Sequence, residues 1–132
     1  KEMAEHFLSY LWERKITLIV PVPLHSRRKR KRGFNQAEIV AKVLSENTGI
    51  AMDAGAVKRI KATSPQKELG DKGRKRNIRG AFAVQKNVKG ENIVLIDDIY
   101  TTGSTLDEAA RVLKKAGAEN VYFLTVSIGQ GI

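Results

Sequence analysis

The pattern of apolar and polar positions in the last third of the chain predicts a strand, a helix and a second strand. Residues 93–96 (IVLI) form a continuous apolar run, which is typical of a strand buried on both faces of a parallel sheet. Apolar residues then recur at helical spacing over residues 106–116, and a second apolar run covers residues 121–126. This order, in about 35 residues, matches a βαβ unit with a right-handed crossover. Residues 97–105 are therefore expected where open α/β sheets bind ligands, beyond the carboxyl end of a strand.

The first half of the chain repeats this pattern of strand, loop and helix. Residues 16–22 predict a strand that ends in prolines, which fit a strand end or edge but not an internal ladder position. A loop over residues 24–34 leads into a helix with Asn35 as its N-cap, and Gly49 is expected to end that helix. If this strand is parallel to the strand at 93–96, both loops open on the same edge of the sheet.

Local signals also predict where the second helix begins and ends. Thr105 is followed three residues later by Glu108, which is the pattern of a capping box. We therefore expect the helix to begin at Thr105. Gly117 follows the last apolar position of the helix and is expected to end it, because glycine adopts the left-handed conformation needed there.

A long polar connection lies between two short strand-like pieces, residues 57–61 and 81–84. The connection, residues 62–80, is rich in lysine, arginine and glycine. A connection of this length inside a compact domain is usually functional or mobile. The sequence therefore predicts a basic, flexible β-hairpin loop.

Residues 97–105 combine two kinds of polar group. Four side chains offer hydroxyl donors: Thr101, Thr102, Ser104 and Thr105. Gly103 allows close backbone approach, and the first N–H groups of the following helix are unpaired, so a dianionic phosphate would be well held there. Asp97 and Asp98 would repel a phosphate. We expect them to face sugar hydroxyls, which donate to carboxylates, or a magnesium ion, which takes carboxylates or waters held by them.

The stretch at residues 93–105, IVLIDDIYTTGST, resembles the phosphoribosyl pyrophosphate (PRPP) signature of type I phosphoribosyltransferases. Together with residues 20–38 (VPVPLHSRRKRKRGFNQAE) and the segment from Gln66 through residues 74–82 (RKRNIRGAF), it resembles the ComF family of phosphoribosyltransferase-like proteins associated with competence for DNA uptake. The resemblance covers nearly the whole chain. It implies an α/β fold of the type I phosphoribosyltransferase kind, with a mostly parallel sheet flanked by helices, and a PRPP site that depends on Mg²⁺.

The resemblance also implies roles for individual residues. Asp97 and Asp98 would be the catalytic pair that holds the ribose hydroxyls, contacting the metal through these hydroxyls or through water, while residues 101–105 wrap the 5′-phosphate. The loop after the first strand would contact the pyrophosphate, with Leu24, His25, Arg28 and Arg32 as candidates. In these enzymes the flexible loop closes over the site during catalysis, which would bring to the pyrophosphate Gln66, Arg74, Arg76, Asn77 or Arg79.

The positive charge of the chain is concentrated in two segments. The formal net charge is +10, and residues 27–32 (RRKRKR) carry six positive charges. Residues 58–79 hold nine basic and two acidic residues, so they carry +7 and the rest of the chain carries −3. Such local basicity attracts polyanions, and the two candidates are a pyrophosphate with its sugar phosphate, or nucleic acid.

Composition limits the remaining possibilities. The 132 residues, of which 42% are apolar, suit one domain over residues 1–132 with a single core. The absence of cysteine excludes disulfides and thiolate zinc sites within this chain. Chains that resemble the ComF family often carry an upstream cysteine-rich zinc-binding segment, and this sequence begins at Lys1, so we expect a fragment that lacks that segment. No run approaches the length of a membrane span and no signal peptide is visible, so the expected location is the cytoplasm.

Two functions fit these observations. The first is a phosphoribosyltransferase that uses PRPP and Mg²⁺ to modify an unidentified acceptor. The second is a non-enzymatic competence protein that binds single-stranded DNA or partner proteins and uses the PRPP pocket as a sensor or scaffold. Single-strand platforms usually interleave aromatic residues with positive charge. Only Phe34 and Phe82 lie near the basic segments, so backbone electrostatics is favoured over base stacking.

Overall fold

A four-stranded parallel sheet forms the centre of the protein, as the computed structural model shows for residues 9–23, 36–60, 79–98 and 103–126. Its strand order is β2-β1-β5-β6, and every neighbouring pair is parallel. The bounds are β1 (Leu18–Pro21), β2 (Ala51–Met52), β5 (Asn92–Asp98) and β6 (Asn120–Val126). The predicted parallel sheet and its strands at 16–22, 93–96 and 121–126 are confirmed, whereas the two-residue β2 was not expected.

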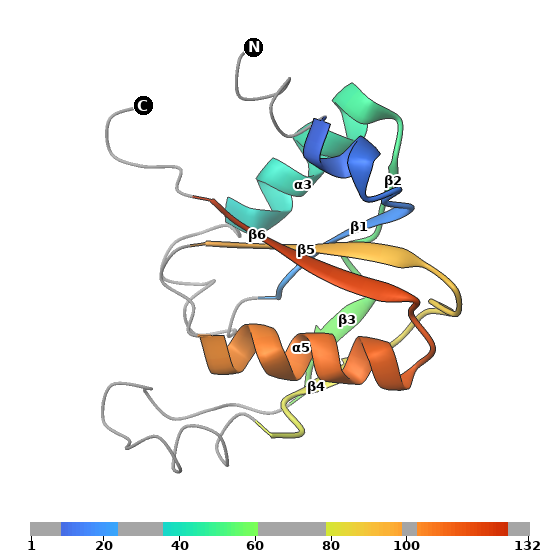
Figure 1. Cartoon of the computed structure of the whole chain (residues 1–132). Helices are drawn as coiled ribbons and strands as arrows, with labels where there is room; N and C mark the ends of the chain where they lie inside the picture. The colour runs from blue at the N-terminus through green and yellow to red at the C-terminus, as the bar shows by residue number, and fades with distance from the viewer. Residues whose placement is uncertain (1–8, 24–35, 61–78, 99–102, 127–132) are drawn as a thin grey trace.

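Helices cover both faces of this sheet (Figure 1). On one face lie α3 (Gln36–Thr48) and a short helical segment at residues 9–13. On the other face lies α5 (Gly103–Lys115), together with a small second sheet. None of the helices within the described ranges has the length and apolar character needed to cross a membrane.

The second sheet is an antiparallel pair, β3 (Val57–Arg59) and β4 (Phe82–Val84). Arg59 is paired with Phe82. The chain therefore leaves β3 at residue 60 and returns to β4 from residue 81 at the same end of the strand pair. This confirms the predicted strand pieces on either side of the basic connection. Most of the connection itself, residues 61–78, lies outside the described residues.

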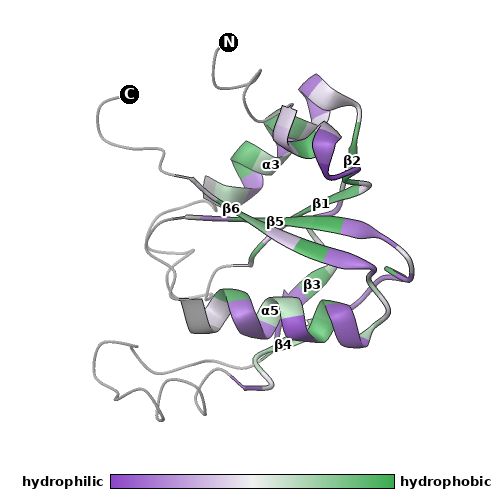
Figure 2. Ribbon diagram, in the orientation of Figure 1, coloured by the Kyte–Doolittle hydropathy of each residue, from purple (hydrophilic) through white to green (hydrophobic). Residues whose placement is uncertain are grey.

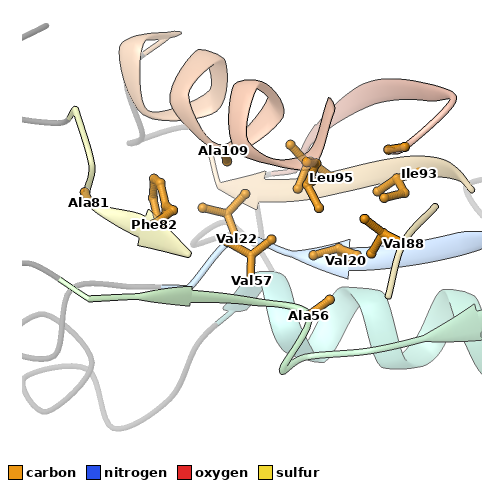
Figure 3. Close-up of a cluster of buried hydrophobic side chains, with 12 residues drawn as sticks. Val20, Val22, Ala56, Val57, Ala81, Phe82, Val88, Ile93, Leu95 and Ala109 are labelled. Atoms are coloured by element: carbon orange, nitrogen blue, oxygen red, sulfur yellow. The ribbon is translucent and has the colours of Figure 1, made fainter. Parts of the chain in front are cut away.

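The core is divided by the sheet into two clusters because successive residues of a strand face opposite sides. Val20, Ile93 and Leu95 pack against α5 and the β3–β4 pair, and Figure 3 shows their side chains gathered with Phe82 and Ala109. Ile19 and Val94 pack on the other face, beneath α3. Both clusters are buried, which explains why β1 and β5 are continuous apolar runs, and Figure 2 shows the hydrophobic colour along the middle of β5.

Glycines end both long helices, as predicted. Gly49 has φ +78° and donates its N–H to the carbonyl of Ser45, the single bond of an αL cap. Gly117 has φ +109° and donates to Lys114, while the next N–H, of Ala118, donates to Leu113. These two bonds are the Schellman arrangement. An added Cβ at Gly117 would lie 3.3 Å from the side chain of Lys89, so the position is also closely packed.

The predicted start of α5 is wrong. The helix begins at Gly103, so Thr105 is an inner residue of the first turn and not an N-cap. Glu108 does not reach back along the helix. Its carboxylate accepts hydrogen bonds from Arg111 and from the backbone of Gly80. Tertiary and i,i+3 partners therefore replace the local capping box.

Candidate functional site

The carboxyl ends of the parallel strands meet at one edge of the sheet. Pro21 pairs with Ile96, and Val22 donates its N–H to the carbonyl of Ile96 at 2.9 Å. Asp97 is therefore directly beyond the end of β1 and is paired on its other side with Thr125 of β6. In Figure 1 these strand ends and the start of α5 lie together at the left. The two predicted loops, after β1 and after β5, do leave the same edge, which we call the carboxyl rim.

Pro21 fits this position because its backbone nitrogen, which carries no hydrogen, faces away from β5. The N–H of Val22 points toward β5, so the nitrogen of Pro21 points to the opposite side, toward β2. The pairing of β2 with β1 stops at Met52, opposite Ile19. The proline therefore removes no hydrogen bond from the ladder, as expected for an edge position.

Asp97 is the central polar group of the rim. Its exposed fraction is 1%, although it lies at the end of a strand and carries an ionisable carboxyl group. It shares a strand face with Ile93 and Leu95, which is the face covered by α5. Burying a carboxylate is costly unless polar groups compensate it, so the burial of Asp97 argues against a solvated turn residue and for a functional role. Asp98 is the last residue of β5 and is paired with Val126.

The first turn of α5 contains three of the predicted phosphate-binding residues. Gly103 and Ser104 are its first two residues, and Thr105 is buried, with an exposed fraction of 5%. The first four N–H groups of a helix have no partner within it, so the turn presents backbone donors toward the rim. The structure thus brings Asp97 and the amino terminus of α5 to the same face and the same edge of the sheet.

The remaining predicted contacts cannot be placed. They are Leu24, His25, Arg28, Arg32, Gln66, Arg74, Arg76, Asn77, Thr101 and Thr102, all of which lie outside the described residues. The points where their segments join the fold are described. Residues 24–35 follow Pro23 at the rim, and residues 61–78 connect Ile60 to Arg79. Residues 24–35 carry a net charge of +6 and residues 61–78 carry +4, so the rest of the chain is neutral.

Arg59 connects described residues that adjoin these two basic segments, and the sequence analysis did not identify it as a site residue. Its Nε–H donates to the carbonyl of Pro23 at 3.4 Å, and its guanidinium lies 4.8 Å from the ring centroid of Phe82. The side chain therefore connects the end of β1 with both strands of the β3–β4 pair. Its position two residues after the buried Val57 was an available signal, since alternation puts both on one face of β3.

Glu108 makes a second link between the β3–β4 pair and the rim. The exposed fraction of the residue is 6%. Its Oε1 accepts from Nε of Arg111 at 2.9 Å, and its Oε2 accepts from Nη2 of Arg111 at 2.7 Å and from the N–H of Gly80 at 3.0 Å. The i,i+3 spacing to Arg111 was the sequence signal for this pair.

The environment of Glu108 keeps it ionised. The hydrogen bonds from Arg111 lower the pKa of Glu108 below its ordinary value and outweigh burial, which acts in the opposite direction. The N–H of Gly80 and the positive charges of Arg111 and Arg79 lower this pKa further. The same pair raises the pKa of Arg111. Arg79, predicted as a pyrophosphate contact, therefore lies within electrostatic range of Glu108.

No group of three or more His, Cys, Asp or Glu side chains that could hold a metal occurs among the residues with described positions. Among the residues whose side chains the structure describes, Asp97 places a buried carboxyl group at the rim, and Asp98 is the next residue along β5. A metal ion bound here would not be surrounded by protein ligands alone and would need further ligands, such as water or substrate oxygens.

Comparison with known proteins identifies the relatives of the chain. A model of the phosphoribosyl transferase domain matches residues 4–128. The DNA utilization protein YhgH of Salmonella typhi is 43% identical over 103 residues, which are 78% of this chain and 45% of that protein. Competence protein F of Haemophilus influenzae is 42% identical over 106 residues, which are 78% of this chain and 46% of that protein. The chain therefore spans about half the length of these curated relatives.

The fold also matches a solved structure. Purine phosphoribosyltransferase from Pyrococcus horikoshii has a TM-score of 0.60 to this chain and 22% sequence identity, and the match covers 95% of this chain and 70% of that one. At this identity the likeness concerns the fold alone. The predicted type I phosphoribosyltransferase-like fold is confirmed.

The pair of Glu108 and Arg111 generates a prediction about stability and pH. Glu108→Gln should lower the free energy of unfolding by about 1–2 kcal/mol near pH 7, because it removes an ionised, partly buried acceptor. Since the pKa of Glu108 is lowered by folding, this stabilisation is present above the ordinary value of 4.5 and is lost as the pH falls through the lower value of the folded state. Urea unfolding at about pH 7 and about pH 3.5 measures the difference. A deficit that is equal at both pH values would contradict this assignment.

Proposed function

The chain belongs to the phosphoribosyl transferase domain family and, within it, to the competence-associated ComF group, and from this premise we propose that it binds PRPP with Mg²⁺ at the carboxyl rim and transfers the phosphoribosyl group to an acceptor. The observation that supports this most is the buried carboxyl group of Asp97 on the α5 face, at the edge where α5 begins. A pentose phosphate needs these two features side by side, because its hydroxyls donate hydrogen bonds and its phosphate accepts them.

Each part of the rim has a distinct task in this proposal. The N–H groups of the first turn of α5 and the hydroxyls of the TTGST segment bind the 5′-phosphate. Asp97 and Asp98 accept hydrogen bonds from the ribose hydroxyls and so orient the reacting carbon. Binding energy from the phosphate, which does not react, can then be used to position the sugar.

The Asp97–Asp98 pair also fits Mg²⁺. This ion prefers oxygen ligands and is usually held by one or two carboxylates together with waters and substrate phosphates. Two adjacent carboxyl groups without a third acidic, histidine or cysteine partner among the described residues suit that kind of site. When bound, the ion would neutralise charge on the diphosphate that leaves.

The basic segments supply the remaining positive charge. Both join the fold beside the rim, through Pro23 on one side and through the β3–β4 pair on the other. Cationic side chains fixed near a leaving diphosphate stabilise the charge that develops on it, which is often the largest single contribution to catalysis. Arg28, Arg32 and Arg79 are the arginines that we assign to this role first.

A second candidate function is a non-enzymatic role in DNA utilization. Relatives named for DNA utilization and for competence favour it, as does the net charge of +10, which two segments of the sequence carry. Phe82, one of the two aromatic residues near these segments, is buried at 3% exposure and packs in the core. Base stacking on this residue is therefore excluded, and single-stranded DNA would be held through its phosphates.

The first prediction of the proposed function concerns ligand binding. PRPP with Mg²⁺, at about 100 times its Kd, should stabilise the protein by about 2.7 kcal/mol, which raises Tm by about 10 °C. The double variant Asp97→Asn/Asp98→Asn should lose this shift because an amide is a weaker acceptor for ribose hydroxyls and for the metal. Thermal unfolding with and without ligand measures both.

A charge-matched control separates this effect from a general change in charge. Asp107→Asn/Glu119→Gln removes two negative charges from exposed positions and should keep the ligand-induced shift. An unaltered protein whose Tm does not respond to PRPP would overturn the proposal.

Turnover is the second prediction. The protein should release pyrophosphate from PRPP with at least one acceptor in a panel of bases, amines and nucleic acids. Asp97→Asn should slow this release on the order of a hundredfold, because a misplaced sugar loses the alignment that makes the reaction effectively intramolecular. Binding of PRPP without release for any acceptor would favour the non-enzymatic role.

The DNA-binding role gives a prediction that depends on salt. Affinity for a single-stranded oligonucleotide should fall steeply as salt rises, and Arg28→Gln/Arg32→Gln should reduce the slope of log K against log salt by about 1.4, since each lost phosphate contact contributes about 0.7. Lys114→Gln/Lys115→Gln removes the same charge from the last turn of α5 and should leave the slope unchanged. Competition by PRPP would show that DNA and PRPP share the rim. A slope that only the lysine variant reduces would exclude this role for the arginines.

A further inference from the structure

Arg59 is a charged residue beside the rim that the proposed chemistry does not use. It shares a face of β3 with Val57, whose side chain packs with those of Val22 and Phe82 in the core (Figure 3). The guanidinium of Arg59 lies 4.8 Å from the ring centroid of Phe82, and its Nε–H donates to the carbonyl of Pro23 at 3.4 Å. These two contacts place the side chain between the β3–β4 pair and the end of β1.

The carbonyl of Pro23 lies beyond the point where β1 has a neighbouring strand on that side. β2 is the outermost described strand there, and it ends at Met52. The carbonyl of Ile19 accepts from the N–H of Asp53, and every second carbonyl along an extended chain points to the same side. Arg59 therefore gives the carbonyl of Pro23 a donor where a longer β2 would have provided a backbone N–H.

We propose that Arg59 is a positioning residue that holds the end of β1, and through it the peptide group before Asp97, in the place that an anionic sugar ligand at the rim requires. This rests on the proposed function, because the ligand is PRPP and Asp97 is the carboxyl group that accepts from its ribose hydroxyls. Arg59 acts through the backbone and does not itself contact the ligand.

The connection from Arg59 to Asp97 is short. Pro23 is joined by one peptide bond to Val22, whose N–H donates to the carbonyl of Ile96 at 2.9 Å. That carbonyl belongs to the peptide group between Ile96 and Asp97. Val22 is buried, whereas Pro23 is half-buried, so packing alone holds the chain less firmly at Pro23. A shift of the end of β1 therefore moves the peptide group from which the side chain of Asp97 projects.

The two contacts of Arg59 require an arginine and not only a positive charge. A planar guanidinium can lie against an aromatic ring while its Nε–H donates to a carbonyl, whereas a lysine ammonium is a point charge on a flexible chain. Arg59→Lys therefore keeps the charge beside Phe82 but loses the fixed geometry that joins β3 to Pro23.

Amide hydrogen exchange, measured by NMR without ligand, tests whether Arg59 holds the end of β1. Arg59→Gln should speed exchange of the Val22 N–H about tenfold, because the strand end opens more often. The N–H of Thr17, which donates to Asn92 at the other end of β1, should change by less than about twofold. Unchanged exchange at Val22, or equal acceleration at both ends, would overturn the proposal, since equal acceleration means that Arg59 merely stabilises the whole fold.

The affinity for PRPP in the presence of Mg²⁺, measured by calorimetry, tests the consequence for the ligand. Arg59→Gln and Arg59→Lys should each weaken binding about threefold to tenfold, the effect expected of one hydrogen bond. Lys86→Gln, which removes an exposed positive charge beyond the opposite end of the β3–β4 pair, should change binding by less than about twofold. Arg59→Lys also serves if Arg59→Gln does not fold. A lysine variant that binds as tightly as the unaltered protein would mean that only the charge matters and would contradict the positioning role.

A double-mutant cycle with Asp97→Asn tests the route of the effect. In the Asp97→Asn background, Arg59→Lys should change PRPP affinity by less than about twofold, because the residue that it positions has already been altered. Equal losses with and without Asp97 would mean that Arg59 acts on the ligand directly. If the unaltered protein fails to bind PRPP, the proposed function falls together with this inference. If it binds PRPP and both Arg59 variants bind equally well, this inference alone falls.

Discussion

The parallel pairing of β1 with β5 is the constraint on which the rest of this structure depends. Both strands are buried on both faces, so a one-residue shift in their register would place Val20 and Leu95 in the wrong cluster. The observed register brings Pro23 and Asp97 to one edge of the sheet. A polar site at that edge thus follows from apolar packing along the whole length of the two strands.

Among the described residues, two buried carboxyl groups lie on the α5 side of the sheet, and their surroundings differ. Glu108 is paired with Arg111 and with a backbone N–H, so its charge is used inside the protein. Asp97 lies near the end of β5, at the carboxyl rim. Glu108 is thus engaged in a contact within the protein, whereas Asp97 is a buried carboxyl group at the edge of the sheet where α5 begins.

The sequence predicted the parts of the structure that local physics decides. The apolar run at residues 93–96 identified a strand because burial on both faces leaves no polar position, and Gly117 identified a helix end because a left-handed residue is needed there. Contacts distant in sequence were not predictable in this way. The capping box failed because Glu108 found stronger partners in Arg111 and Gly80, and the contact between Arg59 and Pro23 joins residues 36 apart.

The distribution of charge connects the fold with both proposed functions. Two segments account for the whole net charge, and described residues near their ends make polar contacts, from Arg59 to Pro23 and from Gly80 to Glu108. The repulsion between like charges at such density is unfavourable. An anion bound at the rim would relieve it. The same arrangement therefore favours a compact diphosphate or a nucleic acid backbone, and the buried Asp97, which suits sugar hydroxyls, favours the former.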